Sequence, residues 1–372
     1  MLYLDHAATT PPRPEALDAM RSAGYGNPSG IHGVAREAKD LLEDARERAA
    51  ALIGARPAEI VFTGGGTEAD NLAVIGAALA AGASVVTTAV EHDAVLESAA
   101  FLRRMGHRVE VVGVDRMGRV DPERVAAATA AGPCVVSVMA ANNETGVIEP
   151  VTDIVEAVRN VSSDAIVHTD AVQVFPSEPI DVDVLGVDLL TLAAHKFGGP
   201  KGVGLLYVRQ GTKLEPLVHG GGQETGLRSG TQNVAGIVGM AAAMEAADAD
   251  RERFRADVGE ARRRFETRLA GIVEGFEINA PFEERLIQHS HIRIPGVRND
   301  TVLIRLDRAG VAASAGSACQ SGAADVSHVL LAMGFSNDRA RECLRFSFGW
   351  TTTPDDGDIA AAAVLEAIAG LG

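Results

Sequence analysis

Short apolar runs alternate with helical stretches between about residues 30 and 210, and this alternation constrains the fold more than any other feature of the sequence. The runs are rich in β-branched residues and lie at Glu59–Phe62, Ser84–Val90, Val109–Val114, Cys134–Ala140, Ala165–Thr169, Leu189–Ala193 and Gly204–Val208. Continuous apolar strands separated by helices are typical of a mainly parallel sheet that is covered on both faces. The sequence therefore predicts an α/β fold with a mainly parallel, seven-stranded sheet sandwiched by helices.

The pattern changes after residue 230 and predicts a second, smaller unit. Residues 231–272 form one long helix or a helix pair and contain no proline. Strands and helices then follow in mixed order, with elements expected at Ser290–Ile294, Asp300–Ala309, Ser327–Met333, Arg345–Phe348 and Pro354–Gly370. A chain of 372 residues suits about two domains. We expect a large domain of residues 15–255 and a smaller α+β domain of residues 1–14 and 256–372.

Charge and apolar patterning exclude several classes of protein. With 34 Lys and Arg against 50 Asp and Glu, the net charge is −16, so we expect no nucleic-acid partner. Arg262, Arg263 and Arg264 lie among acidic residues and are expected on a solvated helix face. The N-terminus lacks a signal-peptide pattern, and apolar runs such as Leu72–Ala83 are too short to span a bilayer. We therefore expect a cytoplasmic protein without a membrane partner.

The metal-ligating residue types are sparse. Cys134, Cys319 and Cys343 are far apart in the sequence, which provides neither a disulfide framework nor a zinc ligand set and suits a reducing compartment. His289 and His291 alternate along one expected strand, but no third ligand accompanies them. We expect a surface strand pair there, and no metal site.

Three short motifs at strand ends have residue types that suit a cofactor. Residues 63–68, TGGGTE, lie between a strand and a helix, where free backbone N–H groups suit a phosphate; a plain tight turn is the alternative. Lys196 follows a buried strand, where an amine is costly unless it is paired or forms a Schiff base; a lysine that reaches solvent is the alternative. Asp170 ends another strand and would either pair with a protonated ring nitrogen or cap a helix.

Together the three motifs match the three handles of pyridoxal 5′-phosphate (PLP). The glycine turn suits its phosphate, Asp170 its pyridine nitrogen and Lys196 its aldehyde. Because the joint pattern is more specific than any of its parts, the sequence predicts a PLP enzyme.

A larger set of ordered motifs runs along nearly the whole chain: YLDHAATTP, GNPSG, EIVFTGGGTEADNLA, EHDAVL, NNETGVI, HTDAVQ, AHKFGGPKGVG, HGGGQETGLRSGTQN, SAGSACQSG and LRFSFG. In these the chain resembles the cysteine desulfurases, in the class V aminotransferase-like branch of PLP enzymes. The resemblance implies the PLP-dependent transferase fold type I and removal of sulfur from L-cysteine to give L-alanine and a persulfide. The loop length before Ser327 is similar to that of the long-loop subgroup, whose members resemble housekeeping sulfur donors for iron–sulfur cluster assembly.

The resemblance also implies a role for each matching residue. Lys196 would hold PLP as a Schiff base, Asp170 would pair with the pyridinium, and Gln173 would hydrogen-bond the phenolic oxygen. His92 would stack on the ring and assist proton transfers. The phosphate would be held by Gly66, Thr67, His195 and, in a homodimer, Thr231 of the partner subunit. Asn143 would contact both cofactor and substrate, Arg345 would fix the substrate carboxylate, and Asn27 would lie near the substrate.

Cys319 would accept the sulfur and pass it to a sulfur-acceptor protein. It lies in a loop of about residues 312–326 that consists almost entirely of small residues, so we expect this loop to move and to reach a buried cofactor. The attacking species would be the thiolate. An idle buried thiol is the alternative, and we expect that structural role for Cys134 and Cys343.

Two features depart from the family pattern. Ala193 stands where a serine commonly precedes the His-Lys pair, which removes one hydroxyl donor to the phosphate at a cost of about 0.5–1.5 kcal/mol. Thr191 and water are the candidate substitutes. The sequence ends at Gly372, directly after the last expected helix, where relatives that dock a scaffold through a C-terminal extension have more chain, so this docking mode is left open. The alternatives in function are a selenocysteine lyase, another class V aminotransferase-type enzyme, and a non-catalytic subunit that retains the fold.

Overall fold

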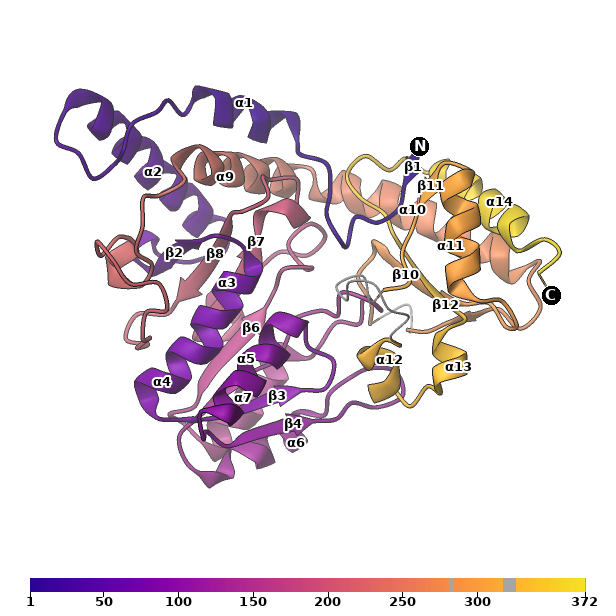
Figure 1. Ribbon diagram of the computed structural model, residues 1–372, viewed down its shortest axis with the longest axis horizontal. Helices are drawn as coiled ribbons and strands as arrows, with labels where there is room; N and C mark the ends of the chain where they lie inside the picture. The colour runs from indigo at the N-terminus through magenta and orange to yellow at the C-terminus, as the bar shows by residue number, and fades with distance from the viewer. Residues whose placement is uncertain (281–283, 317–325, 372) are drawn as a thin grey trace.

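A seven-stranded sheet forms the centre of the larger part of the molecule (Figure 1). The structure, a computed structural model, describes residues 1–280, 284–316 and 326–371. The strands follow the order β2 (Ile60–Thr63), β8 (Gly204–Val208), β7 (Leu189–Ala193), β6 (Ile166–Asp170), β5 (Cys134–Ser137), β3 (Ser84–Thr88) and β4 (Val109–Val112). β8 runs antiparallel to β2 and β7, and every other neighbouring pair is parallel. The predicted sheet is therefore confirmed, with one reversed strand.

Helices cover both faces of this sheet, because successive residues of each buried strand point to opposite faces. In β5, Val136 packs in one apolar core and Val135 in another. The first core is shared with α2 (Gly33–Ala51), α6 (Pro122–Ala128), α7 (Val151–Val161) and α9 (Val234–Ala249), and the second with α3 (Gly66–Asn71), α4 (Ala77–Ala81) and α5 (Asp93–Arg104). α1 (Pro14–Ser22) packs on α9, and α8 (Val182–Leu185) is a short helix before β7.

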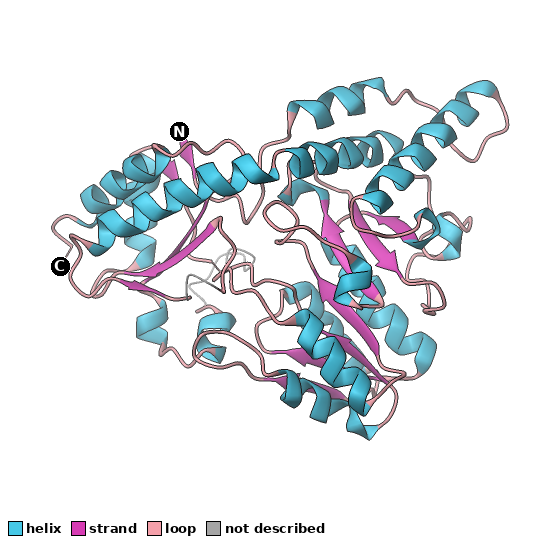
Figure 2. Cartoon of the chain, turned by 180° about the vertical axis from the view of Figure 1, so that it is seen from behind, coloured by secondary structure: helices cyan, strands magenta, loops and turns pink. Residues whose placement is uncertain are grey.

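The N-terminal residues and the residues after α9 form the second part, on which both termini lie (Figures 1 and 2). α10 (Arg251–Ala270) begins two residues after α9 ends, so the expected helix pair is confirmed. A three-stranded antiparallel sheet has the order β12 (Cys343–Ser347), β10 (His289–Arg293) and β9 (Glu277–Ile278), while β1 (Leu2–Tyr3) pairs in parallel with β11 (Val311–Ala312). The remaining helices are α11 (Asn299–Arg308), α12 (His328–Ala332), α13 (Asn337–Ala340) and α14 (Asp356–Ile368).

This second part has an apolar core of its own. Phe265 of α10 lies with its ring 4.7 Å from that of Phe346 and 6.0 Å from that of Phe348. Leu4, next to β1, is buried in the same core. The domain boundaries expected at residues 15 and 255 stay a prediction.

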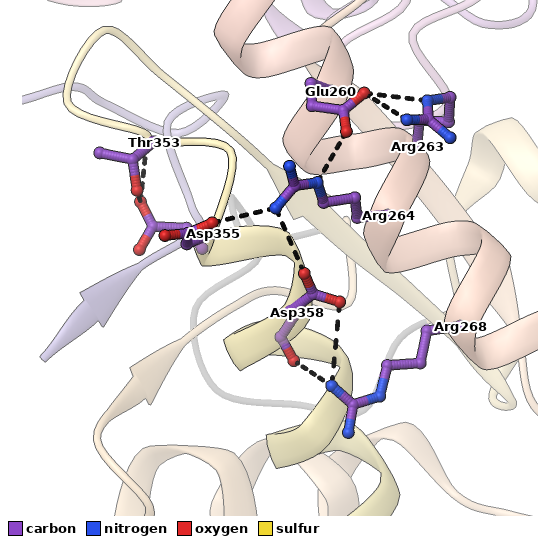
Figure 3. Close-up of polar contacts among 8 residues, drawn as sticks. Glu260, Arg263, Arg264, Arg268, Thr353, Asp355 and Asp358 are labelled. Carbon is purple, nitrogen blue, oxygen red and sulfur yellow. Dashed lines mark hydrogen bonds and ion pairs between the residues drawn. The ribbon is translucent and has the colours of Figure 1, made fainter.

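The expected solvated face of α10 is wrong for one of its three arginines. Arg262 is completely buried, because its spacing from Val258 and Phe265 places all three on the inner face of the helix. The other two arginines face outward: Arg263 and Arg264 both donate to Glu260, and Arg264 also reaches Asp355 and Asp358 at α14 (Figure 3).

The expected surface position of His289 and His291 is also wrong. Both side chains are completely buried, and Nδ1 of His291 lies 2.9 Å from Nδ2 of the buried Asn279. Among the residues that the structure describes, no group of three His, Cys, Asp or Glu side chains could hold a metal ion. The expected burial of Cys134 and Cys343 is confirmed.

No helix within the described residues has the length and apolar character needed to cross a membrane.

Candidate active site

Lys196 lies at the carboxyl edge of the sheet, in the 3₁₀ turn Ala194–Lys196 that directly follows β7. In open α/β sheets this edge is where ligands bind. Its Nζ donates to the carbonyl oxygens of Ala7 and Ala8, the latter at 3.0 Å. The N-terminal segment therefore passes directly over the amine.

Asp170 ends β6, the strand beside β7, and is 6% exposed. Its Oδ1 accepts a hydrogen bond of 2.9 Å from the backbone N–H of Val172. Burial raises the pKa of this carboxyl, while the neighbouring His92 and Lys196 act to lower it. The structure thus brings three of the predicted site residues, Asp170, His92 and Lys196, into one electrostatic group.

Asp70 on α3 is a second buried carboxyl, and it interacts electrostatically with Asp170. Burial and the charge of Asp170 raise the pKa of Asp70 well above its usual value. His168 joins this group: its Nε2 lies 3.7 Å from Asp70 Oδ1 and 3.0 Å from Thr191 Oγ1. Because Thr191 is completely buried and its hydroxyl contacts His168, it is a poor substitute for the hydroxyl missing at Ala193.

His92 is the N-cap of α5. Its Nδ1 accepts a hydrogen bond of 3.1 Å from the backbone N–H of Ala94. Nδ1 is therefore the unprotonated nitrogen in the neutral ring, and Nε2 carries the proton. Gln173, which is 7% exposed, donates from Nε2 to the carbonyl of Ala7 at 3.1 Å. Both side chains are thus oriented by backbone contacts.

Gly66 and Thr67 form the first turn of α3, after Gly65, whose φ of +148° suits glycine. No side chain caps this turn, so its N–H groups can meet an anion. A Cβ placed on Gly66 would lie 3.2 Å from Val172 Cγ2 and 3.3 Å from Ala193 Cβ, so a larger residue here would press against both neighbours. A cavity of about 740 Å³ borders this turn.

His195 lines the same cavity, together with Lys201 and Arg228. Burial, followed by the charges of Lys196 and Lys201, lowers the pKa of His195 to about 4. The ring is therefore neutral at pH 7. Its Nδ1 lies 3.2 Å from Thr9 Oγ1. A neutral ring whose Nδ1 accepts from this hydroxyl can donate from Nε2 to a phosphate oxygen.

Arg345, on β12, is held on two sides and is 2% exposed. One guanidinium nitrogen donates to the carbonyl of Asn143 at 2.8 Å, and the other to Asp5 Oδ1 at 2.8 Å. The structure therefore brings Asn143 and Arg345 together as predicted. Asp5 was missed, although it belongs to the YLDHAATTP motif and that motif was the signal that could have found it.

Two predicted residues that the structure describes are not brought into this group. Asn27 is exposed in the loop between α1 and α2, where its Oδ1 accepts from the N–H of Ser29 at 3.0 Å. Thr231 is exposed shortly before α9. Within the described ranges, neither side chain hydrogen-bonds the residues around Lys196. Cys319 lies outside the described residues.

These residues fit PLP in size and chemistry. The uncapped turn beside Gly66 suits the phosphate, because a side chain would fill the space there. The buried Asp170 suits a protonated ring nitrogen, and Lys196 follows the adjacent strand at the same edge of the sheet.

Comparisons with known proteins agree with this chemistry. The family model for aminotransferase class-V matches residues 2–359. The cysteine desulfurase IscS of Dictyoglomus turgidum is 43% identical over 361 residues, which cover 95% of this chain and 91% of that protein. The putative cysteine desulfurase IscS 1 of Bacillus subtilis is 41% identical, with 99% and 98% covered.

Solved structures show the same likeness. A NifS-like protein superposes with a TM-score of 0.91 at 36% identity over 98% of both chains. The structure of SspA in complex with cysteine superposes with a TM-score of 0.81 at 33% identity, covering 94% of this chain and 99% of that one. The chain therefore belongs to the aminotransferase class-V family of PLP-dependent enzymes, and its relatives within that family are cysteine desulfurases.

Proposed function

We propose that this protein is a PLP-dependent cysteine desulfurase, which converts L-cysteine to L-alanine and leaves the sulfur as a persulfide on Cys319. The observation that carries the proposal is the grouping of Asp170, His92 and Lys196 at one sheet edge. Support also comes from the relatives, which are named cysteine desulfurases, and from the SspA structure, which was solved with cysteine.

Lys196 would bind the cofactor through Nζ, and Asp170 would hold its ring nitrogen in the charged form. When bound, PLP supplies an electron sink for the electrons released at the substrate Cα. Lys196 and His92 are the groups available to move protons, because a free amine can accept one and the neutral His92 ring carries one on Nε2 that it can donate. His195, Gly66 and Thr67 would bind the phosphate through neutral and backbone donors.

Arg345 would bind the substrate carboxylate, because a guanidinium offers two parallel donors to a carboxylate. Its contacts with Asp5 and the Asn143 carbonyl fix its orientation. The substrate is then held between this carboxylate-binding group and the proton-transfer group at Lys196.

The sulfur transfer would be balanced without an external oxidant. The Cys319 thiolate attacks the substrate sulfur, so an S–S bond forms and the C–S bond breaks. The electron pair of the broken bond stays on the substrate carbon, which takes up a proton and becomes the methyl group of L-alanine. Cys319 is oxidised to the persulfide level, and the substrate carbon is reduced.

Three further expectations form part of the proposal. The enzyme would be a homodimer in which Thr231 of the partner subunit completes the phosphate site, and the exposure of Asn27 and Thr231 is compatible with such contacts. The persulfide would pass to an acceptor protein, as in iron–sulfur cluster assembly. The site of action would be the cytoplasm.

Two variants test the chemistry. Cys319→Ala is expected to keep the absorption band of bound PLP but to lose the persulfide that forms with L-cysteine. Lys196→Ala is expected to lose the band of covalently bound PLP. The matched control Cys134→Ala removes a buried thiol and is expected to keep both signals. A persulfide on the Cys319→Ala protein would contradict the acceptor assignment, and an unchanged band in Lys196→Ala would contradict the covalent link. Parallel turnover of L-selenocysteine tests the lyase alternative.

A further inference from the structure

We infer that Glu144 is a positioning residue that fixes both flanks of the segment carrying Cys319, and thereby sets how its thiol is presented to the substrate. The inference rests on the proposed function, because it concerns the delivery of sulfur to Cys319. It is carried by contacts among described residues on both sides of residues 317–325.

The first contact is on the C-terminal flank. Ser327 Oγ donates to Glu144 Oε2 at 2.6 Å, and both residues are buried. The same hydroxyl accepts from the backbone N–H of Leu330 at 3.1 Å, which makes Ser327 the N-cap of α12. Glu144 is therefore linked through a single side chain to the first turn of the helix that follows the Cys319 segment.

The second contact is on the N-terminal flank. A Cβ placed on Gly316 would lie 2.9 Å from Glu144 Oε2, so the Gly316 backbone packs directly against the same carboxylate oxygen. Gly316 has a φ of +103°, which suits glycine. Its N–H donates to Ser314 Oγ at 3.0 Å, and its carbonyl lies 3.4 Å from a guanidinium nitrogen of Arg345. Both flanks thus meet at one oxygen.

Glu144 is itself held in a rigid turn. Its backbone N–H, and that of Thr145, donate to Asn142 Oδ1 at 2.9 Å. Asn143, which lies between Asn142 and Glu144 in the sequence, provides the carbonyl oxygen that accepts from Arg345. The turn after β5 therefore makes two kinds of contact. Through Asn143 it holds Arg345, which we propose to bind the substrate carboxylate, and through Glu144 it contacts both flanks of the Cys319 segment.

Burial of a carboxyl group at this position has a high desolvation free energy. Glu144 is 2% exposed, and burial raises its pKa, against the effects of Ser327, His328 and Arg345. An apolar side chain would fill the same volume without this desolvation cost. A positioning role accounts for the polar group, because only an acceptor can bind the Ser327 hydroxyl.

The test compares Glu144→Leu and Ser327→Ala with the control Glu149→Leu in the PLP-loaded enzyme, because leucine, unlike glutamine, offers no acceptor to a hydroxyl. Glu149 is an equally buried carboxyl, which accepts from the N–H of Val120 at 3.0 Å and contacts neither flank. In a single turnover with L-cysteine, the spectral change of the bound cofactor reports the steps before sulfur transfer. Mass spectrometry of the protein reports the persulfide on Cys319.

We expect the two test variants to form the persulfide about tenfold or more slowly while the spectral change keeps its rate within about twofold. Ser327→Thr retains a hydroxyl and is expected to restore the rate. In the PLP-free protein, the alkylation rate of Cys319 by iodoacetamide is expected to change in Glu144→Leu but not in Glu149→Leu.

Equal slowing of both signals, or no slowing of either, would overturn the role of Glu144. Failure of the proposed function has a different signature, since wild type and Glu149→Leu would then also lack a persulfide on Cys319.

Discussion

At Ala193, a single methyl group separates β7 from the glycine turn. A Cβ built on Gly66 would lie 3.3 Å from the Ala193 Cβ. A hydroxyl added at Ala193 would therefore lie beside the first turn of α3, where we propose that the phosphate binds. We expect Ala193→Ser to lower the dissociation constant of PLP about two- to tenfold, because one hydrogen bond contributes about 0.5–1.5 kcal/mol. Titration of the PLP-free protein measures this. Ala193→Gly, which lacks the hydroxyl, is the control, and an unchanged constant in Ala193→Ser would show that the site already has this donor.

The roles of single residues could be predicted from the sequence where a reactive residue type stands in a recognisable motif. Lys196 follows one buried strand and Asp170 ends another, and these positions together with the glycine turn suggested a cofactor site. Asp5 and Glu144 were not recognised, because each acts through a partner distant in the sequence: Asp5 through Arg345 and Glu144 through Ser327. Both residues lie in motifs of the sequence analysis, but a motif does not report which distant side chain each of its residues contacts.

At the scale of elements, Glu91 joins the ends of two strands and a helix beside His92. Its Oε1 accepts from Thr88 Oγ1 at 2.7 Å, at the end of β3, and from the N–H of Met139 at 3.0 Å, just after β5. Its own carbonyl lies 3.0 Å from Nε2 of His328, the first residue of α12. The turn that carries His92 is therefore fixed from three directions.

This buried carboxyl predicts a particular pH dependence of stability. Burial raises the pKa of Glu91 to about 8, above the usual 4.5, so the folded state keeps a proton that the unfolded state loses. Its contribution to the free energy of unfolding therefore falls as the pH rises from about 4.5 to 8. Glu91→Gln removes this effect and is expected to gain stability over wild type between pH 5 and pH 9.

Thermal unfolding of the PLP-free protein measures the difference at each pH. The control is Glu97→Gln, an exposed residue on α5 that should give a difference independent of pH. A constant difference for Glu91→Gln as well would show that Glu91 is ionised in the folded state throughout.

The positions of the helices and strands could be predicted from the sequence more completely than the directions in which the strands run. The apolar runs and the helix pair α9–α10 appear where expected. The reversal of β8 was not predicted, because the apolar content of a buried strand is the same in either direction. The burial of Arg262 was missed for a related reason: charge alone places an arginine on the surface, and only the packing of α10 shows otherwise.

At the scale of the whole molecule, the N-terminal segment connects the two parts. Leu4 is completely buried in the core of the second part, and its backbone bonds to Ala312 and Ser347 at 2.8 Å. A few residues later, Ala7 and Ala8 accept from Lys196 in the large part. The segment thus ties one core to the cofactor edge of the other.

Leu4→Ala is expected to lower the free energy of unfolding by about 2–4 kcal/mol, because it leaves a cavity in a well-packed core. It should also speed the loss of bound PLP, because the segment over Lys196 loses its anchor. Urea unfolding and the decay of the PLP band measure the two effects. Leu17→Ala, on the exposed side of α1, is the control and should change stability by less than about 0.5 kcal/mol. Equal effects of the two substitutions would contradict the anchoring role.

The pairing of Asp5 with Arg345 spans 340 positions of the sequence and has a consequence for biosynthesis. The core beneath the proposed cofactor site includes α9, and the cavity beside the glycine turn includes Arg228, so this part of the molecule is complete once residue 249 has been synthesised. Arg345 belongs to β12, near the end of the chain. A chain still growing on the ribosome therefore completes the core of the larger part before it can hold a substrate carboxylate.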